Sequence, residues 1–297
     1  MFKLAFLSLF LLLVNTTVSC KNNPVTNETV NSQIHNYNYP VAKLNNEWIY
    51  MKDVIDRNIN ESLKEMVVNY AIWKIIEDKK KELNIQHLPE ELIKRAASAI
   101  NSYKNEWGKE AFLKILNDSQ TSEEEYIKNF SKSNKLHETF TLEKLFIYEL
   151  LTQETVEIEI AELNRLLDAV QIRNEFKENS DKDLKSILTQ YAIKANYYTP
   201  SRCLKGTLSI DFGITETDKL FLMGENILSD PINSKSNTIY LVRKIKHYKE
   251  SKKNFSTIQP EIINEILTNP PPDELLKKYS NYLLSTNNLL INVEKER

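Results

Sequence analysis

The chain has 297 residues, of which 41% are hydrophobic and 27% charged, and its formal net charge is −2. This balance is typical of a globular protein long enough to bury one large core or two smaller ones. Its 39 basic and 41 acidic residues are well mixed along the sequence. No basic face therefore indicates nucleic-acid binding, and we exclude nucleic acid as a partner.

Residues 1–19 have the organisation of a secretory signal peptide. One early lysine precedes an apolar run from Leu4 to Val14, interrupted only by Ser8, which is short for a membrane span and typical of a signal peptide. The segment Thr17-Val-Ser-Cys20 then resembles a bacterial lipobox, although Thr17 stands where leucine is usual. We expect export to the bacterial cell envelope and a lipid anchor at Cys20, facing the periplasm on the inner or the outer membrane. The alternative is an ordinary cleaved signal beside an incidental cysteine.

Residues 20–40 are polar and rich in asparagine, without apolar periodicity, which predicts a flexible tether. The next ten residues alternate around the turn-prone pair Asn45-Asn46 and predict a hairpin over 41–50. Apolar residues at intervals of three and four then predict a series of helices. These helices cover residues 61–83, 89–103, 109–116, 121–151 and 157–169, the fourth opening with a capping box at Thr121-Ser-Glu-Glu124.

After residue 170 the pattern predicts a small part of mixed helix and strand. The predicted strands are Val170–Phe176, Thr207–Phe212 and Thr238–Ile245, with a helix around residues 181–192. Helical periodicity returns over 258–267 and 273–284, and residues 289–293 predict a last strand. The sequence therefore predicts an α+β fold that is mainly α, with a small α+β insert.

This order of elements resembles the SurA/PrsA-type extracytoplasmic foldases. The residues that carry the resemblance are Val41–Val54, Gly108–Phe112, Thr121–Ile127, Asp183–Leu188, Lys205–Phe212 and Ile227–Ile232. The resemblance implies a helical chaperone domain over 41–156, and a linking helix and degenerate parvulin-like domain over 157–250. It also implies that the C-terminal helices and strand, 251–297, return to the chaperone domain.

Active parvulins place one histidine in the first strand and one in the closing strand, and the two rings face each other. The predicted first strand, Val170–Phe176, contains no histidine, and the closing strand carries Tyr240 in its place. Cys203, in a predicted loop where the family often has aspartate or cysteine, and Tyr240 are the remaining catalytic candidates. A free cysteine is also commonly a packed core residue. We expect a parvulin-like domain without isomerase activity.

The resemblance implies an exported holdase or foldase for unfolded or assembling envelope polypeptides. Its client would contact aromatic and methionine side chains on the helix stripes, although each of these side chains could instead close the core of its own domain. The candidate client-binding residues are Met66, Tyr70, Trp73, Tyr103, Trp107 and Tyr126.

Two alternatives remain. The first is an active prolyl isomerase, since isomerisation needs no nucleophile, only a cleft that lowers a rotation barrier of about 20 kcal/mol. The second is a non-catalytic lipoprotein subunit of an envelope assembly. No phosphate-binding glycine loop, metal-ligand spacing or Ser-His-Asp set is present, so we expect no cofactor, metal or small-molecule substrate.

Overall fold

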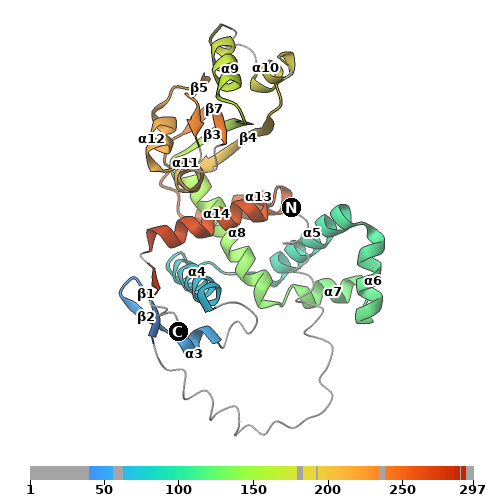
Figure 1. Cartoon of the computed structure of the whole chain (residues 1–297). Coiled ribbons are helices and arrows are strands. Elements are labelled where there is room, and N and C mark those ends of the chain that lie inside the picture. The colour runs from blue at the N-terminus through green and yellow to red at the C-terminus, as the bar shows by residue number, and fades with distance from the viewer. Residues whose placement is uncertain are drawn as a thin grey trace, which may run out of the picture. The chain divides into compact units, whose positions relative to one another are not determined.

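The computed structural model describes residues 40–55, 63–178, 183–191, 193–233, 238–287 and 289–291 (Figure 1). The predicted signal peptide, the tether and Cys20 lie outside these residues. The chain divides into two compact units, one of residues up to 78, 86–141 and 287 onward, the other of residues 79–85 and 142–286. The mainly helical α+β class is confirmed. The domain boundaries at residues 156 and 250 stay a prediction.

The first unit contains a small antiparallel sheet in the order β2-β1-β8. Strands β1 (Pro40–Leu44) and β2 (Glu47–Tyr50) form the expected hairpin, and β8 (Leu290–Ile291) pairs with the other side of β1. The backbone of Asn45 has φ 47° and that of Asn46 has φ 72°. Asparagine tolerates this left-handed conformation, which suits a tight hairpin turn.

Helices make up most of the first unit, and two of them continue into the second. They are α3 (Met51–Ile55), α4 (Leu63–Glu82), α5 (Pro89–Trp107), α6 (Lys109–Ser119), α7 (Glu123–Phe130) and α8 (Asn134–Thr152). The helical region predicted over 121–151 consists of two helices, α7 and α8. Ser133 separates them by accepting a hydrogen bond from the backbone N–H of Leu136 at 3.3 Å. The cap of α7 is Ser122, which accepts from the N–H of Glu125, and not Thr121.

The second unit is built on a five-stranded antiparallel sheet in the order β4-β3-β7-β5, with β6 also paired to β7. Its strands are β3 (Thr155–Leu163), β4 (Asn196–Leu204), β5 (Ile227–Leu228), β6 (Ile232–Asn233) and β7 (Ile239–Tyr248). The long strands β3 and β7 lie in the middle, so both edges of each are paired with neighbouring strands.

The helix predicted over 157–169 is wrong, because most of this segment is strand β3. Its apolar residues Val156 and Ile158 recur at intervals of two, and the strand is buried on both faces. A helix, α9 (Leu166–Glu178), begins only after the strand. Leu166 and Leu167, which the helical pattern placed in the core, are 51% and 72% exposed.

Two of the strands predicted after residue 170 are also wrong. Val170–Phe176 lies within α9, and Thr207–Phe212 lies within α11 (Lys205–Phe212). The closing strand was predicted correctly and is β7, and the helix near residue 185 is α10 (Leu184–Gln190).

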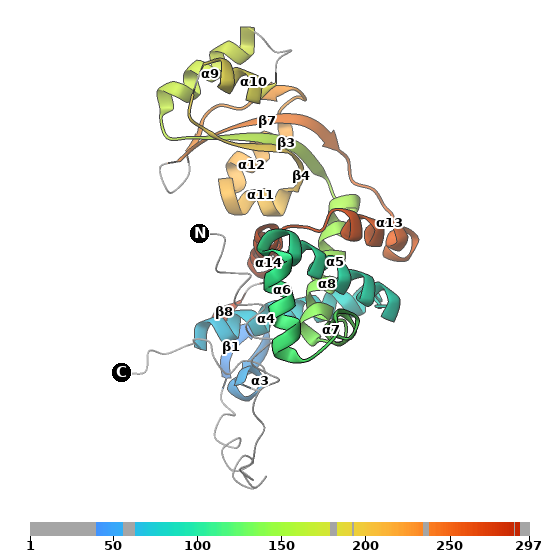
Figure 2. The ribbon, with the colours of Figure 1, turned by 90° about the vertical axis from the view of Figure 1, so that its right-hand side faces the viewer.

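Helices cover both faces of this sheet (Figure 2). α9 and α10 pack on one face around Ile172 and Leu241, whereas α11 and α12 (Ile214–Leu222) pack on the other around Ile158 and Val242. The C-terminal helices α13 (Phe255–Thr268) and α14 (Asp273–Thr286) belong to the same unit. In the described part of the chain, no helix combines the length and apolar character that a membrane crossing requires.

Candidate functional site

The candidate catalytic residues lie on the face of the second sheet that α11 and α12 cover. Tyr240 of β7 is paired across the sheet with Glu162 of β3. The Tyr240 ring contacts the Phe212 ring edge-on, with centroids 5.4 Å apart. Burial, and then the negative charges of Glu162 and Asp211, raise the pKa of Tyr240. Its phenol therefore stays protonated at neutral pH and serves as a packed ring with a polar end.

Glu162 is held by a second tyrosine from the neighbouring strand. The Tyr198 hydroxyl donates a hydrogen bond to the Glu162 carboxylate at 2.7 Å. This hydrogen bond, with partial burial, raises the pKa of Tyr198 to about 12. Sequence reasoning had no ground to single out Glu162, because residues 157–169 were predicted to be a helix. Only the register of β3 against β7 brings Glu162 opposite Tyr240.

Cys203 lies in strand β4, opposite Val156 of β3, and not in the predicted loop. Its sulfur approaches the carbonyl oxygen of Ser201 at 3.6 Å. Burial raises the pKa of Cys203 to about 11. Because the thiolate and not the thiol is the nucleophile, this raised pKa disfavours a nucleophilic role for Cys203 at neutral pH. It packs as a small apolar residue between β3 and α11.

The facing histidine pair of active parvulins has no counterpart on these two strands. The first strand of the sheet is β3, and Thr155–Leu163 contains no histidine. The residue opposite Tyr240 is Glu162, so a phenol and a carboxylate, and not a pair of imidazoles, stand opposite each other on these strands.

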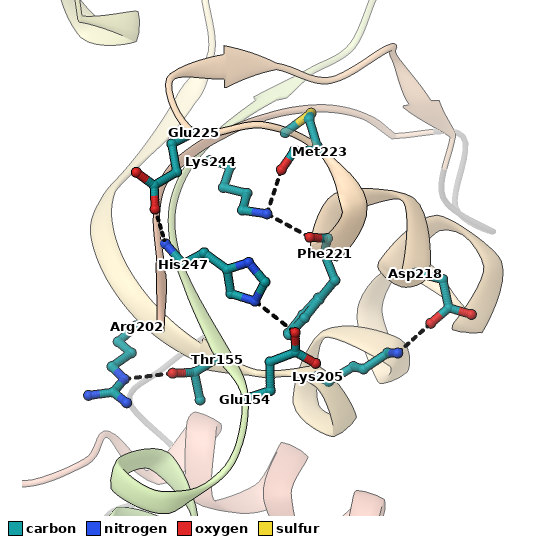
Figure 3. Close-up of polar contacts among 10 residues, drawn as sticks. All are labelled: Glu154, Thr155, Arg202, Lys205, Asp218, Phe221, Met223, Glu225, Lys244 and His247. Atoms are coloured by element: carbon teal, nitrogen blue, oxygen red, sulfur yellow. Dashed lines mark hydrogen bonds and ion pairs between the residues drawn. The ribbon is translucent and has the colours of Figure 1, made fainter. Parts of the chain in front are cut away.

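The histidine nearest to this face is His247, near the end of β7 (Figure 3). Its Nε2 lies 2.8 Å from a carboxylate oxygen of Glu154, and its ring packs edge-on against Phe221. Its backbone N–H donates to Glu225 at 2.8 Å. His247 is thus engaged at the margin of the sheet, and it is too far along β7 to face Glu162.

Next to His247 on the same face, Lys244 is 1% exposed (Figure 3). Its ammonium donates hydrogen bonds to the backbone carbonyls of Phe221, at 2.6 Å, in the last turn of α12, and of Met223, the C-cap of that helix. Burial lowers the pKa of Lys244. A cation at a helix C-terminus satisfies carbonyls that have no partner within the helix, so we assign Lys244 a structural role.

Three of the predicted client-binding residues come together in the first unit, where α5, α6 and α7 meet. Tyr103 and Trp107 stack with ring centroids 6.3 Å apart, and Phe112 contacts both Tyr103 and Tyr126. We call this group the α5–α7 aromatic cluster. Its members are buried Ile100, Tyr103, Phe112 and Leu116, and partly buried Trp107, Ile115, Tyr126, Ile127 and Phe130.

The other three predicted client-binding residues lie on α4. Met66 is 8% exposed and belongs to the core. Tyr70 and Trp73 are partly buried, and their rings lie 5.4 Å apart. Among the residues that the structure describes, no group of three or more histidine, cysteine, aspartate or glutamate side chains could hold a metal ion.

No protein-family model and no curated protein matches the chain. Solved structures do: the foldase PrsA from Lactococcus lactis is 15% identical, with a TM-score of 0.29, over 86% of this chain and 95% of that one. PrsA from Streptococcus pneumoniae is 13% identical, with a TM-score of 0.32, over 87% and 96%. One of the structurally related SurA-like chaperones PEB4 and Cj1289 from Campylobacter jejuni is 15% identical, with a TM-score of 0.25, over 86% and 100%.

These solved structures are PrsA foldases and SurA-like chaperones, the group that the sequence resembles. At such identities and TM-scores they carry no argument about activity, so the proposals below rest on the residues of this chain.

Proposed function

We propose that the protein is an exported chaperone that holds unfolded or assembling envelope polypeptides. The observation that carries the proposal is the α5–α7 aromatic cluster. Four of its members are buried, but Trp107, Tyr126 and Phe130 keep part of their surface accessible. Grouped aromatic and aliphatic side chains that stay partly exposed are suited to transient contact with apolar segments of a client.

The packing of α7 supports this role. None of its residues is fully buried, although Tyr126, Ile127 and Phe130 face the cluster. Leu113, on α6, is a further apolar side chain that stays 55% exposed in this group of helices. A short helix with so little buried surface adjusts its position at small free-energy cost, which lets one surface accept many client sequences.

The parvulin-like sheet supports a holding role without isomerase chemistry. Tyr240 and Glu162 oppose each other in place of two histidines, and the Cys203 thiol is protonated at neutral pH. A tyrosine opposite a glutamate and a protonated thiol are both typical of a packed protein interior. We therefore propose that this sheet binds or supports and does not catalyse.

We further propose that the mature protein is anchored by a lipid at Cys20 and faces the periplasm. This rests on the apolar run and the lipobox-like segment of the sequence. Mass spectrometry of the membrane fraction tests it: a diacylated N-terminal peptide beginning at Cys20 is expected, and a free thiol on that peptide would contradict it.

The chaperone proposal is tested by light scattering from an aggregating unfolded client at increasing concentrations of the full chain. The double variant Ile127→Ser and Phe130→Ser removes apolar surface from the cluster and should lose most of the suppression. The matched control is Ile214→Ser with Leu222→Ser on α12, which removes two side chains that are 73% and 87% exposed in the second unit. Suppression unchanged in the cluster variant, or lost equally in both, would contradict the proposal.

The same purified full chain and its variants test the two alternative functions, an active prolyl isomerase and a subunit of an envelope assembly. We expect no acceleration of a proline-limited refolding reaction. Acceleration that Tyr240→Phe or Cys203→Ala abolishes would establish an active isomerase instead. A stable stoichiometric partner recovered from the envelope, without suppression of aggregation, would establish the assembly subunit.

A further inference from the structure

The hairpin of β1 and β2, at the margin of the first unit, has one face that points away from the core (Figure 1). Its inner face is apolar: Ala42 and Ile49, which pair across the two strands, are 0% and 1% exposed. Because side chains alternate along a strand, the neighbouring cross-strand pair, Lys43 and Trp48, points outward. Trp48 is 44% exposed, so its indole is not part of the core.

Two lysines lie beside the aromatic rings of the outward face. The Nζ atom of Lys43 is 5.6 Å from the centroid of the Trp48 ring. Tyr50, two residues along the strand from Trp48, has the Nζ atom of Lys52 at 5.9 Å from its ring centroid. We call Lys43, Trp48, Tyr50 and Lys52 the aromatic–lysine face. Each of its two rings thus has an ammonium group beside it.

The acidic residues nearby are engaged in other contacts. Glu47 pairs across the strands with buried Leu44, and its carboxylate forms an ion pair with Lys74 of α4. Asp53 of α3 accepts a hydrogen bond from the backbone N–H of Tyr50 at 3.4 Å. The aromatic–lysine face itself consists of two cations and two rings and contains no acidic residue.

This combination of side chains suits the surface of a lipid bilayer. Tryptophan and tyrosine rings concentrate at membrane–water interfaces, where the ring enters the headgroup region and the N–H or O–H group reaches water. Lysine side chains lay their apolar stems along such surfaces and keep the ammonium among the phosphates. Because the face carries positive charge, charge complementarity favours a membrane with anionic headgroups over a neutral one.

The position of the hairpin in the chain supports the same partner. The described residues begin at Pro40, the first residue of β1, and residues 20–39 connect it to Cys20. A coil of this length spans about 25 Å on average. An anchor at Cys20 would therefore keep the hairpin at a high local concentration above one membrane surface, where even a weak affinity leads to binding.

We propose that the aromatic–lysine face docks on the anionic lipid surface of the membrane that holds the anchor. Trp48 and Tyr50 enter the headgroup region, and Lys43 and Lys52 contact the lipid phosphates. The proposal rests on the lipid anchor proposed at Cys20, and it adds a second contact between the chain and the membrane. It makes no use of the α5–α7 aromatic cluster.

Quenching of tryptophan fluorescence by brominated lipid tests the docking. The chain purified from the membrane fraction is reconstituted in vesicles of phosphatidylethanolamine and phosphatidylglycerol, the latter with brominated acyl chains. Flotation of the chain with the vesicles reports the anchor, whereas quenching reports the docked hairpin. The chain has three tryptophans, and we expect quenching that Trp48→Phe removes and Trp73→Phe retains. Trp48→Phe keeps an aromatic ring on the outward face, so it removes the reporter without removing the surface.

The double variant Lys43→Glu with Lys52→Glu tests the charge of the face. Each lysine near an anionic membrane strengthens binding about fivefold, so the reversal of both should remove most of the quenching. The matched control, Lys177→Glu with Lys185→Glu, makes the same change of charge at exposed positions of the second unit and should retain it. Neutral vesicles of phosphatidylcholine should give little quenching of the unchanged chain.

The two readouts separate failure of the docking from failure of the anchor. Flotation without quenching of Trp48, or equal quenching by neutral vesicles, would overturn the docking and leave the anchor standing. A chain that does not float would contradict the anchor and the docking together. If an unfolded client, and not the lipid, shields Trp48 from acrylamide, the face belongs to clients and the docking proposal is wrong.

Discussion

The buried carboxylate of Glu159 offers the sharpest test of how the second sheet is held together. Glu159 is 1% exposed in the middle of β3, on the face opposite Tyr240. It accepts hydrogen bonds from the guanidinium of Arg243 at 2.9 Å, the hydroxyl of Tyr197 at 2.6 Å and the backbone N–H of Leu184 at 3.4 Å. It therefore links β7, β4 and the start of α10.

Glu159→Gln keeps the volume and one acceptor oxygen but removes the charge. The side chain of Arg243 is only 14% exposed, so the change leaves a largely buried guanidinium without its counter-charge. Removing one partner of a buried ion pair costs about 3–5 kcal/mol, and the retained amide oxygen places our expectation near 3 kcal/mol. Glu162→Gln is the matched control. It makes the same change three residues along the strand, where the carboxylate is half-buried and accepts from Tyr198, and we expect a cost of about 1 kcal/mol or less.

Hydrogen exchange of the β3 and β7 amides measures these costs within the second unit, where urea unfolding of the whole chain would mix two units. The Glu159→Gln, Arg243→Met cycle isolates the pair: the double variant should be less destabilised than the sum of the two singles, because no lone charge remains buried. Equal losses of protection in Glu159→Gln and Glu162→Gln would refute the reasoning, since the difference between them comes from burial and the ion pair.

Two further predictions concern the other face of the sheet. The folded-state pKa of Cys203, about 11, lies above that of an ordinary thiol, so its contribution to stability is fully present below the unfolded pKa and is lost as the pH rises through 11. Cys203→Ser in a Cys20→Ser chain should weaken this alkaline loss, and an identical pH profile would contradict it. Lys244→Met should cost about 2 kcal/mol by leaving the carbonyls of Phe221 and Met223 without a donor, whereas Lys246→Met, at an exposed position of the same strand, should cost no more than about 0.5 kcal/mol. Hydrogen exchange of the β3 and β7 amides measures both costs within the second unit.

The parts of the fold that were predicted correctly from the sequence are those determined by local interactions. The Asn45-Asn46 pair marks a turn that needs two positive φ angles, and its hairpin was predicted with nearly correct ends. The helices that begin at Leu63 and Pro89 have long periodic stripes, and they too were predicted within a few residues.

β3 shows why other parts were missed. In this segment Ile160 and Leu163 are spaced as on one face of a helix, whereas Val156 and Ile158 are spaced as on one face of a strand. The spacing of the apolar residues therefore does not decide between helix and strand. Pairing with β4 and β7 decides it, and that pairing is not a local property. A β-bulge between Glu157 and Ile158 then shifts the register of β3 against β7. The placement of Glu162 opposite Tyr240 depends on that shift in register, and no sequence motif predicts the bulge.

Tyr240, Cys203 and Tyr198 share one physical property, and it bears on what this face of the sheet does. Each has a raised pKa, so each side chain is neutral at physiological pH. A catalytic acid, base or nucleophile needs a pKa close to the working pH, and these three are displaced away from it. Neutral side chains that pack against an aromatic ring, as Tyr240 does against Phe212, stabilise the sheet by burial. The raised pKa values therefore support the proposal that this face contributes packing and not chemistry.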